Sequence, residues 1–108
     1  MIFKRIHILF LVFVMFGIRP IEANSKPTTH SISIKDIKFT PDDLEIDAGD
    51  TVAWTNEDIV PHTVTNKGIF DSKPIQTNAQ YKRLFNKKGD FTYTCTLHPM
   101  MIAKIKVK

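Results

Sequence analysis

Hydrophobic and polar residues alternate in short runs over most of the chain, which is the pattern of half-buried β-strands rather than of helices. Turn formers separate the runs, as in the stretches TPDD, AGD and NKKGD. Ile37 falls one step out of phase with Ile34, which predicts a β-bulge. About seven to eight strands, spaced roughly ten residues apart, predict an all-β antiparallel sandwich or barrel. The runs are 31–39, 44–48, 52–54, 62–65, 81–85, 91–95 and 103–107.

The N-terminal region has the layout of a secretory signal peptide. Lys4 and Arg5 precede an apolar run over residues 6–18, and a polar stretch follows. We expect cleavage after Ala23, with residues 24–30 as a flexible tail and 31–108 as one folded domain. The alternative is an uncleaved anchor, but the apolar run is shorter than the roughly 20 residues that span a bilayer. Export predicts a periplasmic protein with no membrane span after cleavage.

Composition and charge narrow the range of partners. The chain has 108 residues, 15 basic and 11 acidic. Residues 24–108 keep 12 basic and 10 acidic residues, a net charge too small and too mixed to suggest nucleic acid. The distribution is uneven: residues 36–58 hold eight acidic residues, whereas residues 59–108 hold nine basic and two acidic ones. One face is therefore expected to be positive and to steer a charged partner.

Cys95 is the only cysteine, so the expected exported domain has no internal disulfide. His62, Cys95, His98 and either of the adjacent methionines, Met100 and Met101, form a soft set of nitrogen and sulfur ligands. Two histidines and one cysteine in a trigonal site, with a weak axial methionine, select copper for electron transfer, whereas zinc prefers four firm ligands. A buried structural thiol or a catalytic nucleophile is the alternative for the cysteine.

The segments CTLHPMM and FTPDDLEIDAGDTVAWTNEDIVPHTV resemble the cupredoxins, the small blue copper proteins, and with KKGDFTYTC they extend the similarity over residues 31–108. The spacing Cys-x-x-His-x-x-Met is most similar to that of the amicyanin group. The resemblance implies a Greek-key β-sandwich with one type 1 copper ion held by His62, Cys95, His98 and Met101. It implies an exported one-electron carrier that cycles between Cu(II) and Cu(I) and is not an enzyme. Copper storage or delivery through the same ligands is the alternative.

The resemblance also implies roles for the neighbours of these ligands. Relatives commonly have asparagine after the first histidine; here Thr63 stands there, and a hydrogen bond between Thr63 and Thr96 would tie the two ligand loops together. His98 is the expected route of the electron. The expected partners are redox proteins, such as a dehydrogenase, a cytochrome c or a terminal reductase, which meet a monomer through small transient interfaces. The expected docking patch around His98 is Pro61, Leu97, Pro99 and Met100.

Overall fold

A computed structural model describes residues 26–108, so the expected leader and its cleavage after Ala23 lie outside the described residues. The alternating runs form nine strands and no helix within residues 26–108. The expected run 31–39 forms two strands, β1 and β2, and the two-residue strand β6 lies outside the expected runs, which accounts for the higher number. The strands are β1 (Thr29–Lys35), β2 (Lys38–Thr40), β3 (Asp43–Ile46), β4 (Asp50–Asn56), β5 (Thr65–Asn66), β6 (Phe70–Asp71), β7 (Gln80–Phe85), β8 (Gly89–Cys95) and β9 (His98–Val107).

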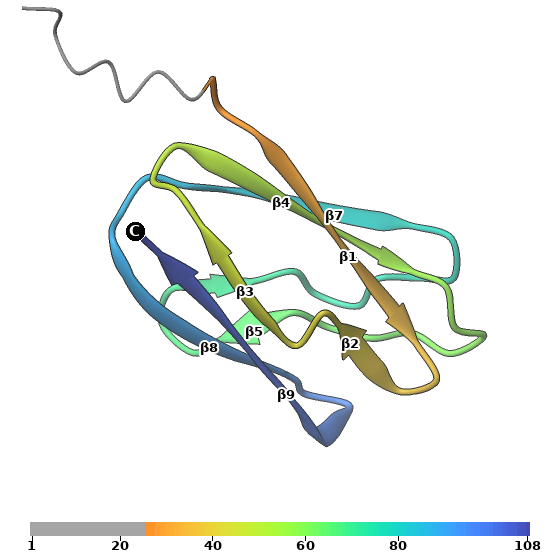
Figure 1. Ribbon diagram of the computed structural model, residues 1–108. Helices are drawn as coiled ribbons and strands as arrows, with labels where there is room; N and C mark the ends of the chain where they lie inside the picture. Colours follow the sequence, from red (N-terminus) through yellow and green to blue (C-terminus); the bar gives the residue numbers. More distant parts are fainter. Residues whose placement is uncertain (1–25) are drawn as a thin grey trace, which may run out of the picture.

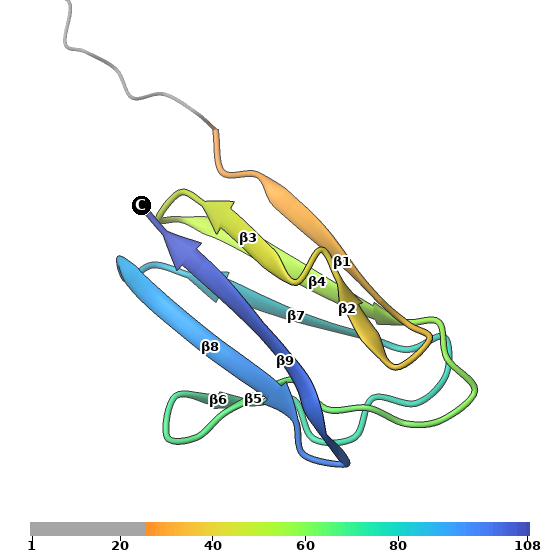
Figure 2. The same cartoon turned by 60° about the horizontal axis from the view of Figure 1, so that its bottom comes forward.

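The strands form two sheets that face each other, which confirms the all-β sandwich (Figures 1 and 2). One sheet has the order β2-β1-β4-β7 and the other β3-β9-β8-β5-β6. One open side of the sandwich is therefore bounded by β2 and β3, and the other by β7 and β6. The connection between β8 and β9 lies at the end of the molecule away from the C-terminus (Figure 1).

Two strand pairs are parallel, β1 with β4 and β3 with β9, whereas antiparallel pairing was expected throughout. The chain leaves the first sheet after β2, adds β3 to the second sheet, and returns to place β4 beside β1. The period-two pattern fixes which face of a strand is buried, but it contains nothing about the direction of the neighbouring strand. The parallel pairs are therefore a property of the tertiary fold.

The interior is filled by the inward side of the alternating runs. Trp54 on β4 and Tyr93 on β8 are fully buried and meet edge to face, with ring centroids 5.5 Å apart. Phe39 packs against the same tyrosine at 4.8 Å. Such aromatic pairs add about 0.5–1.5 kcal/mol each beyond the burial of their area. They join the two sheets two residues before Cys95, so the strand that ends at the cysteine is held firmly.

Strand β1 begins at Thr29, so His30 belongs to the fold rather than to the flexible tail expected over residues 24–30. Its Nε2 lies 2.9 Å from a carboxylate oxygen of Asp50. Asp50 also accepts hydrogen bonds from the backbone N–H groups of Thr28 at 2.9 Å and Asp47 at 3.1 Å. These bonds, first that of Thr28 and then that of His30, lower the pKa of Asp50 from 3.8 to about 2.

The expected bulge near Ile37 is instead a two-residue hairpin turn between β1 and β2. Asp36 and Ile37 have φ values of 52° and 56°, and Lys35 pairs with Lys38 across the turn. Positive φ at both central residues defines the type I′ turn that matches the twist of a hairpin. The alternation changes phase because the chain reverses there, and the turn directs two backbone N–H groups toward the connection after β4.

Candidate metal centre

The ligands expected from the sequence come from two connections at one end of the sandwich. Cys95 ends β8 and His98 begins β9, and a register shift at Thr94 and Cys95 makes these two residues direct partners. His62 lies in the connection between β4 and β5, where it forms a single antiparallel bridge with Ile75. The backbone N–H of His62 donates to the Ile75 carbonyl at 3.2 Å, and the His62 carbonyl accepts from the Ile75 N–H at 2.7 Å. The short turn and the bridge fix the backbone on both sides of the site.

Asn56 holds the His62 connection from inside the protein. It is fully buried, and its side-chain NH₂ group donates to the carbonyls of Val60 at 2.9 Å and Ile75 at 2.8 Å. Its side-chain oxygen accepts from the backbone N–H of Asp58 at 2.9 Å. A buried amide with both ends satisfied specifies one backbone path, because any other path would leave polar groups unpaired. This asparagine therefore helps to set the position of the histidine.

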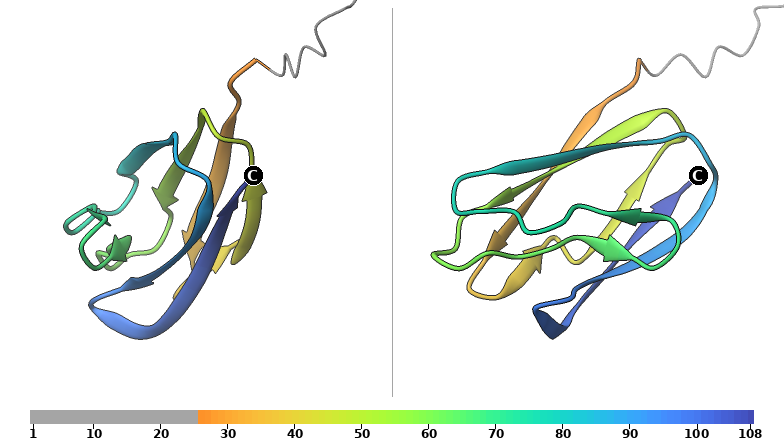
Figure 3. Two further views of the ribbon diagram at one scale, coloured as in Figure 1. Left: turned by 90° about the vertical axis from the view of Figure 1, so that its left-hand side faces the viewer. Right: turned by 180° about the vertical axis from the view of Figure 1, so that it is seen from behind.

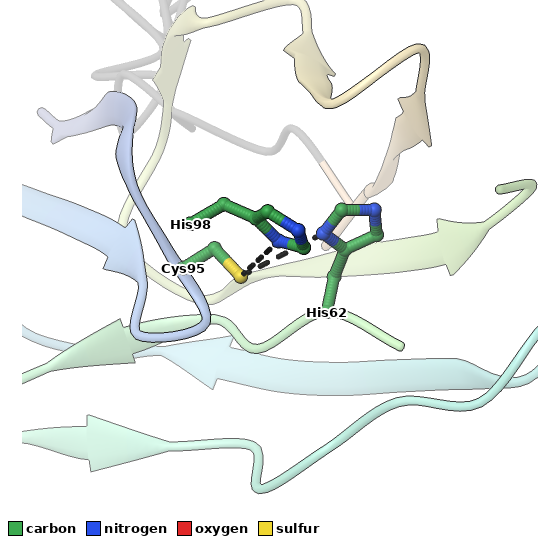
Figure 4. A group of neighbouring side chains, drawn as sticks. All are labelled: His62, Cys95 and His98. Atoms are coloured by element: carbon green, nitrogen blue, oxygen red, sulfur yellow. Dashed lines mark hydrogen bonds between the residues drawn. The ribbon is translucent and has the colours of Figure 1, made fainter. Parts of the chain in front are cut away.

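Three donor atoms converge between the two connections (Figure 4). Cys95 Sγ lies 3.6 Å from His62 Nδ1 and 3.7 Å from His98 Nδ1, and all three atoms lie within 4.8 Å of one another. With metal–sulfur bonds of about 2.3 Å and metal–nitrogen bonds of about 2.0–2.1 Å, angles between tetrahedral and trigonal require S···N distances of about 3.6–3.8 Å. Both S···N distances fall in this range, so the cysteine and each histidine are placed to share one metal ion.

A carboxylate orients His62. Its Nε2 lies 2.7 Å from an oxygen of Asp58, and a carboxylate only accepts, so Nε2 carries the hydrogen and Nδ1 keeps its lone pair toward the thiol. The same carboxylate accepts from the turn amides of Asp36 at 2.7 Å and Ile37 at 3.0 Å. Burial raises the pKa of Asp58, but the hydrogen bonds from Ile37, His62 and Asp36 outweigh it and hold the pKa below its ordinary value.

The predicted hydrogen bond between Thr63 and Thr96 is present, with the two hydroxyl oxygens 3.1 Å apart. The Thr63 hydroxyl also accepts from the Thr96 backbone N–H at 2.9 Å. The backbone N–H of Thr63 points at Cys95 Sγ, 3.3 Å away. A hydrogen bond to sulfur stabilises the thiolate form, which is the form that binds metals. The threonine pair therefore ties the His62 connection to the cysteine turn, as was expected of it.

The two methionines of β9 differ in burial. Met101 is 4% exposed and belongs to the same buried core as Cys95, whereas Met100 is 75% exposed. The expected docking patch reaches the surface: Leu97 is half-exposed, Pro99 is exposed, and Pro61 is partly buried.

Sequence reasoning missed two residues near the site, Asp58 and Ile59. Ile59 is 93% exposed and lies in the same connection as His62. The sequence signal for Asp58 is a carboxylate four residues before the ligand histidine, and for Ile59 an isolated apolar residue in a loop. Neither signal is specific without the fold. The role of Asp58 becomes clear only in the structure, where its carboxylate accepts from the Asp36 and Ile37 amides as well as from His62.

The fold and the converging ligands define a cupredoxin, and the family model of the cupredoxin-like domain matches residues 7–107. The chain belongs to that family. It is 32% identical to the amicyanin of Paracoccus versutus over 97 residues, which cover 83% of this chain and 74% of the relative. It is 34% identical to amicyanin-alpha of Methylorubrum extorquens over 83 residues, which cover 71% of this chain and 70% of the relative.

Solved structures give the same result. The structure of a Cu(I) form of an amicyanin variant matches with a TM-score of 0.70 and 27% identity, covering 74% of this chain and 82% of that one. The similarity to the amicyanin group inferred from the ligand spacing is thus confirmed. Within residues 26–108, no helix has the length and apolar character needed to cross a membrane.

Proposed function

We propose that this protein binds one copper ion as a type 1 site and carries one electron at a time between redox proteins. The ligands are the thiolate of Cys95, the Nδ1 atoms of His62 and His98, and the thioether of Met101. The observation that carries the proposal is the convergence of one sulfur and two imidazole nitrogens at distances that fit one ion. The similarity to an amicyanin solved with Cu(I) supports the choice of copper.

Copper supplies a one-electron couple, and soft thiolate and thioether ligands favour Cu(I) while imidazole suits copper in either state. The protein keeps the ligands in one arrangement: the bridge to Ile75, the Asp58 carboxylate and the threonine pair all restrain the groups around the site. A restrained site changes little when an electron arrives or leaves. His62 and Cys95 are fully buried and His98 is only half-buried, so His98 is the route of the electron to the surface.

Burial favours a carrier over the alternatives. A nucleophilic cysteine must reach a substrate, but Cys95 has 0% exposure and its sulfur faces two imidazoles and a backbone N–H. A storage or delivery protein must release its ion, and two fully buried ligands oppose exchange with another protein. An electron carrier needs neither access of a substrate to the cysteine nor release of the metal ion. We therefore propose that the protein is a carrier and not a catalyst.

We further propose that residues 1–23 act as a cleaved export signal and that the protein works in the periplasm as a monomer. Its partners are redox proteins, a dehydrogenase, a cytochrome c or a terminal reductase, which dock around His98. The docking patch is Pro61, Leu97, Pro99 and Met100, extended by Ile59, whose side chain is almost fully exposed. Apolar patches of this kind suit brief contacts with small interfaces.

The visible spectrum of the purified protein after addition of Cu(II) tests the proposal. We expect an intense blue colour with one copper per chain, lost in Cys95→Ser, because the colour requires the thiolate. Repeated reduction and reoxidation should leave the copper content unchanged. A folded protein that takes up zinc and stays colourless with copper would refute the assignment, and loss of copper on reduction would favour delivery over transfer.

A further inference from the structure

The open side of the sandwich between β6 and β7 carries a guanidinium group that no described residue neutralises. Arg83 occupies an inward-facing position of the edge strand β7, between Tyr81 and Phe85. Its guanidinium carbon lies 4.8 Å from the ring centroid of Phe70 and 5.5 Å from that of Phe85. Stacking on two aromatic rings stabilises a cation and holds it in place. The positively charged Arg83 side chain is therefore held in one position over the aromatic rings at this edge of the core.

This charge is free to meet an acidic ligand. None of the ion pairs among residues 26–108 includes Arg83, and its Nε atom is buried without a hydrogen-bond partner there. Arginine presents five N–H donors in a rigid fork that suits carboxylates. The buried Nε cannot be reached from solvent, so an incoming acceptor would pair with the terminal guanidinium nitrogens, which are not among the buried unpartnered atoms. The group thus has unused capacity for hydrogen bonds.

A groove of about 230 Å³ lies beside this guanidinium. Ile69 and Leu84, each half-exposed, line it together with Lys87. Apolar walls next to two cations fit a ligand that combines carboxylates with a hydrophobic side chain. A nucleic-acid backbone would fit less well, because it offers phosphates in a regular row and requires a longer basic track.

The charges of the two open sides have opposite signs. Residues 80–91, which form β7 and its turn into β8, contain four basic residues and one acidic residue. Residues 36–47, which surround β2 and β3, contain five acidic residues and one basic residue. The sheet order places β2 and β7 at opposite edges of one sheet, and β3 and β6 at opposite edges of the other. This separation orients an acidic partner toward the β7 side before contact.

We propose that the groove beside Arg83 is a docking site for an acidic segment of a partner protein. One carboxylate of that segment pairs with the Arg83 fork, Lys87 adds a second attraction, and an apolar side chain contacts Ile69 and Leu84. The site lies near the turn from β7 into β8, whereas the proposed copper ligands lie near the turn from β8 into β9, at the other end of β8 (Figure 3, right). A partner bound in the groove therefore leaves the surface around His98 open to a second one.

The test is an NMR titration of the ¹⁵N-labelled protein with the synthetic peptide Glu-Glu-Leu-Glu-Glu at low ionic strength. We expect amide shifts on β7 and on the hairpin of residues 66–70, and weaker binding as salt rises toward about 0.15 M. Arg83→Gln should weaken binding about tenfold, the lower range for a hydrogen bond to a charged group. Lys87→Gln, which changes an exposed residue and leaves the core intact, should weaken it as well.

Lys38→Gln is the matched control, because it removes the same charge from the opposite side of the sandwich. We expect it to bind within twofold of the unchanged protein. Shifts confined to the surface around His98, equal losses for Lys38→Gln and Arg83→Gln, or equal binding of Gln-Gln-Leu-Gln-Gln would each overturn the proposal. Tighter binding of a single-stranded DNA oligomer would also overturn it. The visible spectra of the copper-loaded variants report separately on the proposed copper site, so the two proposals can fail independently.

Discussion

Replacing Asp58 by alanine tests the claim that its carboxylate orients His62. The His62 ring is fully buried, so its Nε2–H loses the acceptor that Asp58 provides. The two turn amides that share the carboxylate belong to exposed residues, Asp36 and Ile37, and can bond to water instead. The main free-energy cost of Asp58→Ala is therefore that of one buried donor without a partner, about 1–3 kcal/mol.

In Asp58→Ala this cost appears as lost metal affinity, because a freely turning ring no longer keeps Nδ1 toward Cys95. We expect Cu(II) binding about 10–100-fold weaker, measured by competition with a chelator of known affinity. The reduction potential should rise, since loss of a nearby negative charge destabilises Cu(II) more than Cu(I). Thermal unfolding of the metal-free protein separates a loss of affinity from a loss of stability.

Two further variants isolate the cause. Asp58→Asn removes the charge but can keep an oxygen on the His62 N–H, so its affinity loss should be smaller than that of alanine. Glu57→Gln removes a neighbouring charge whose carboxylate bonds to Ser33 rather than to the site, and should leave affinity unchanged. Unaltered copper affinity and potential in Asp58→Ala would refute the orienting role.

Three other outcomes follow from burial and charge. Met101→Ala should shift the reduction potential while most of the copper stays bound, whereas Met100→Ala should leave both the potential and the copper content unchanged. The reverse result in protein-film voltammetry would contradict the ligand assignment. Ile105→Ala, at a fully buried position, should cost about 2–5 kcal/mol in denaturant unfolding, against little change for Ile102→Ala at a site 60% exposed. The pKa of Asp50 is lowered to about 2, so its carboxylate stabilises the fold fully above about pH 4 and loses this effect as the pH falls toward 2. The melting temperatures of wild type and Asp50→Asn should therefore converge between about pH 4 and 2, and a constant difference would refute the stabilising role of the carboxylate.

The ligand turn could be read from the sequence because its determinants are local. Cys95 and His98 are three residues apart, and the alternation of β8 places the cysteine inside. The choice of Met101 over Met100 came from the spacing in the resemblance, and it agrees with their burial, because Met101 is buried and Met100 is exposed. By contrast, His62 lies 33 residues before Cys95, so only its type of donor atom, its place in a loop and the resemblance to a known family connected the two.

Other contacts could not be predicted from the sequence, because they join segments that are far apart in the chain and share no local pattern. The His62–Asp58 contact matters because the β1–β2 turn brings two amides to the same carboxylate. His30 was taken for part of a tail, since its bond to Asp50 spans 20 residues and depends on the parallel pairing of β1 and β4.

The sequence by itself determined most of the strands, the buried face of those strands, and the soft ligands in one turn, because period-two burial and short-range spacing are properties of neighbouring residues. The tertiary structure decided which strands pair, which pairs run parallel, how a carboxylate and a threonine pair restrain the ligands, and where Arg83 meets Phe70. These contacts depend on the packing of two sheets, and packing brings together residues that are distant along the chain.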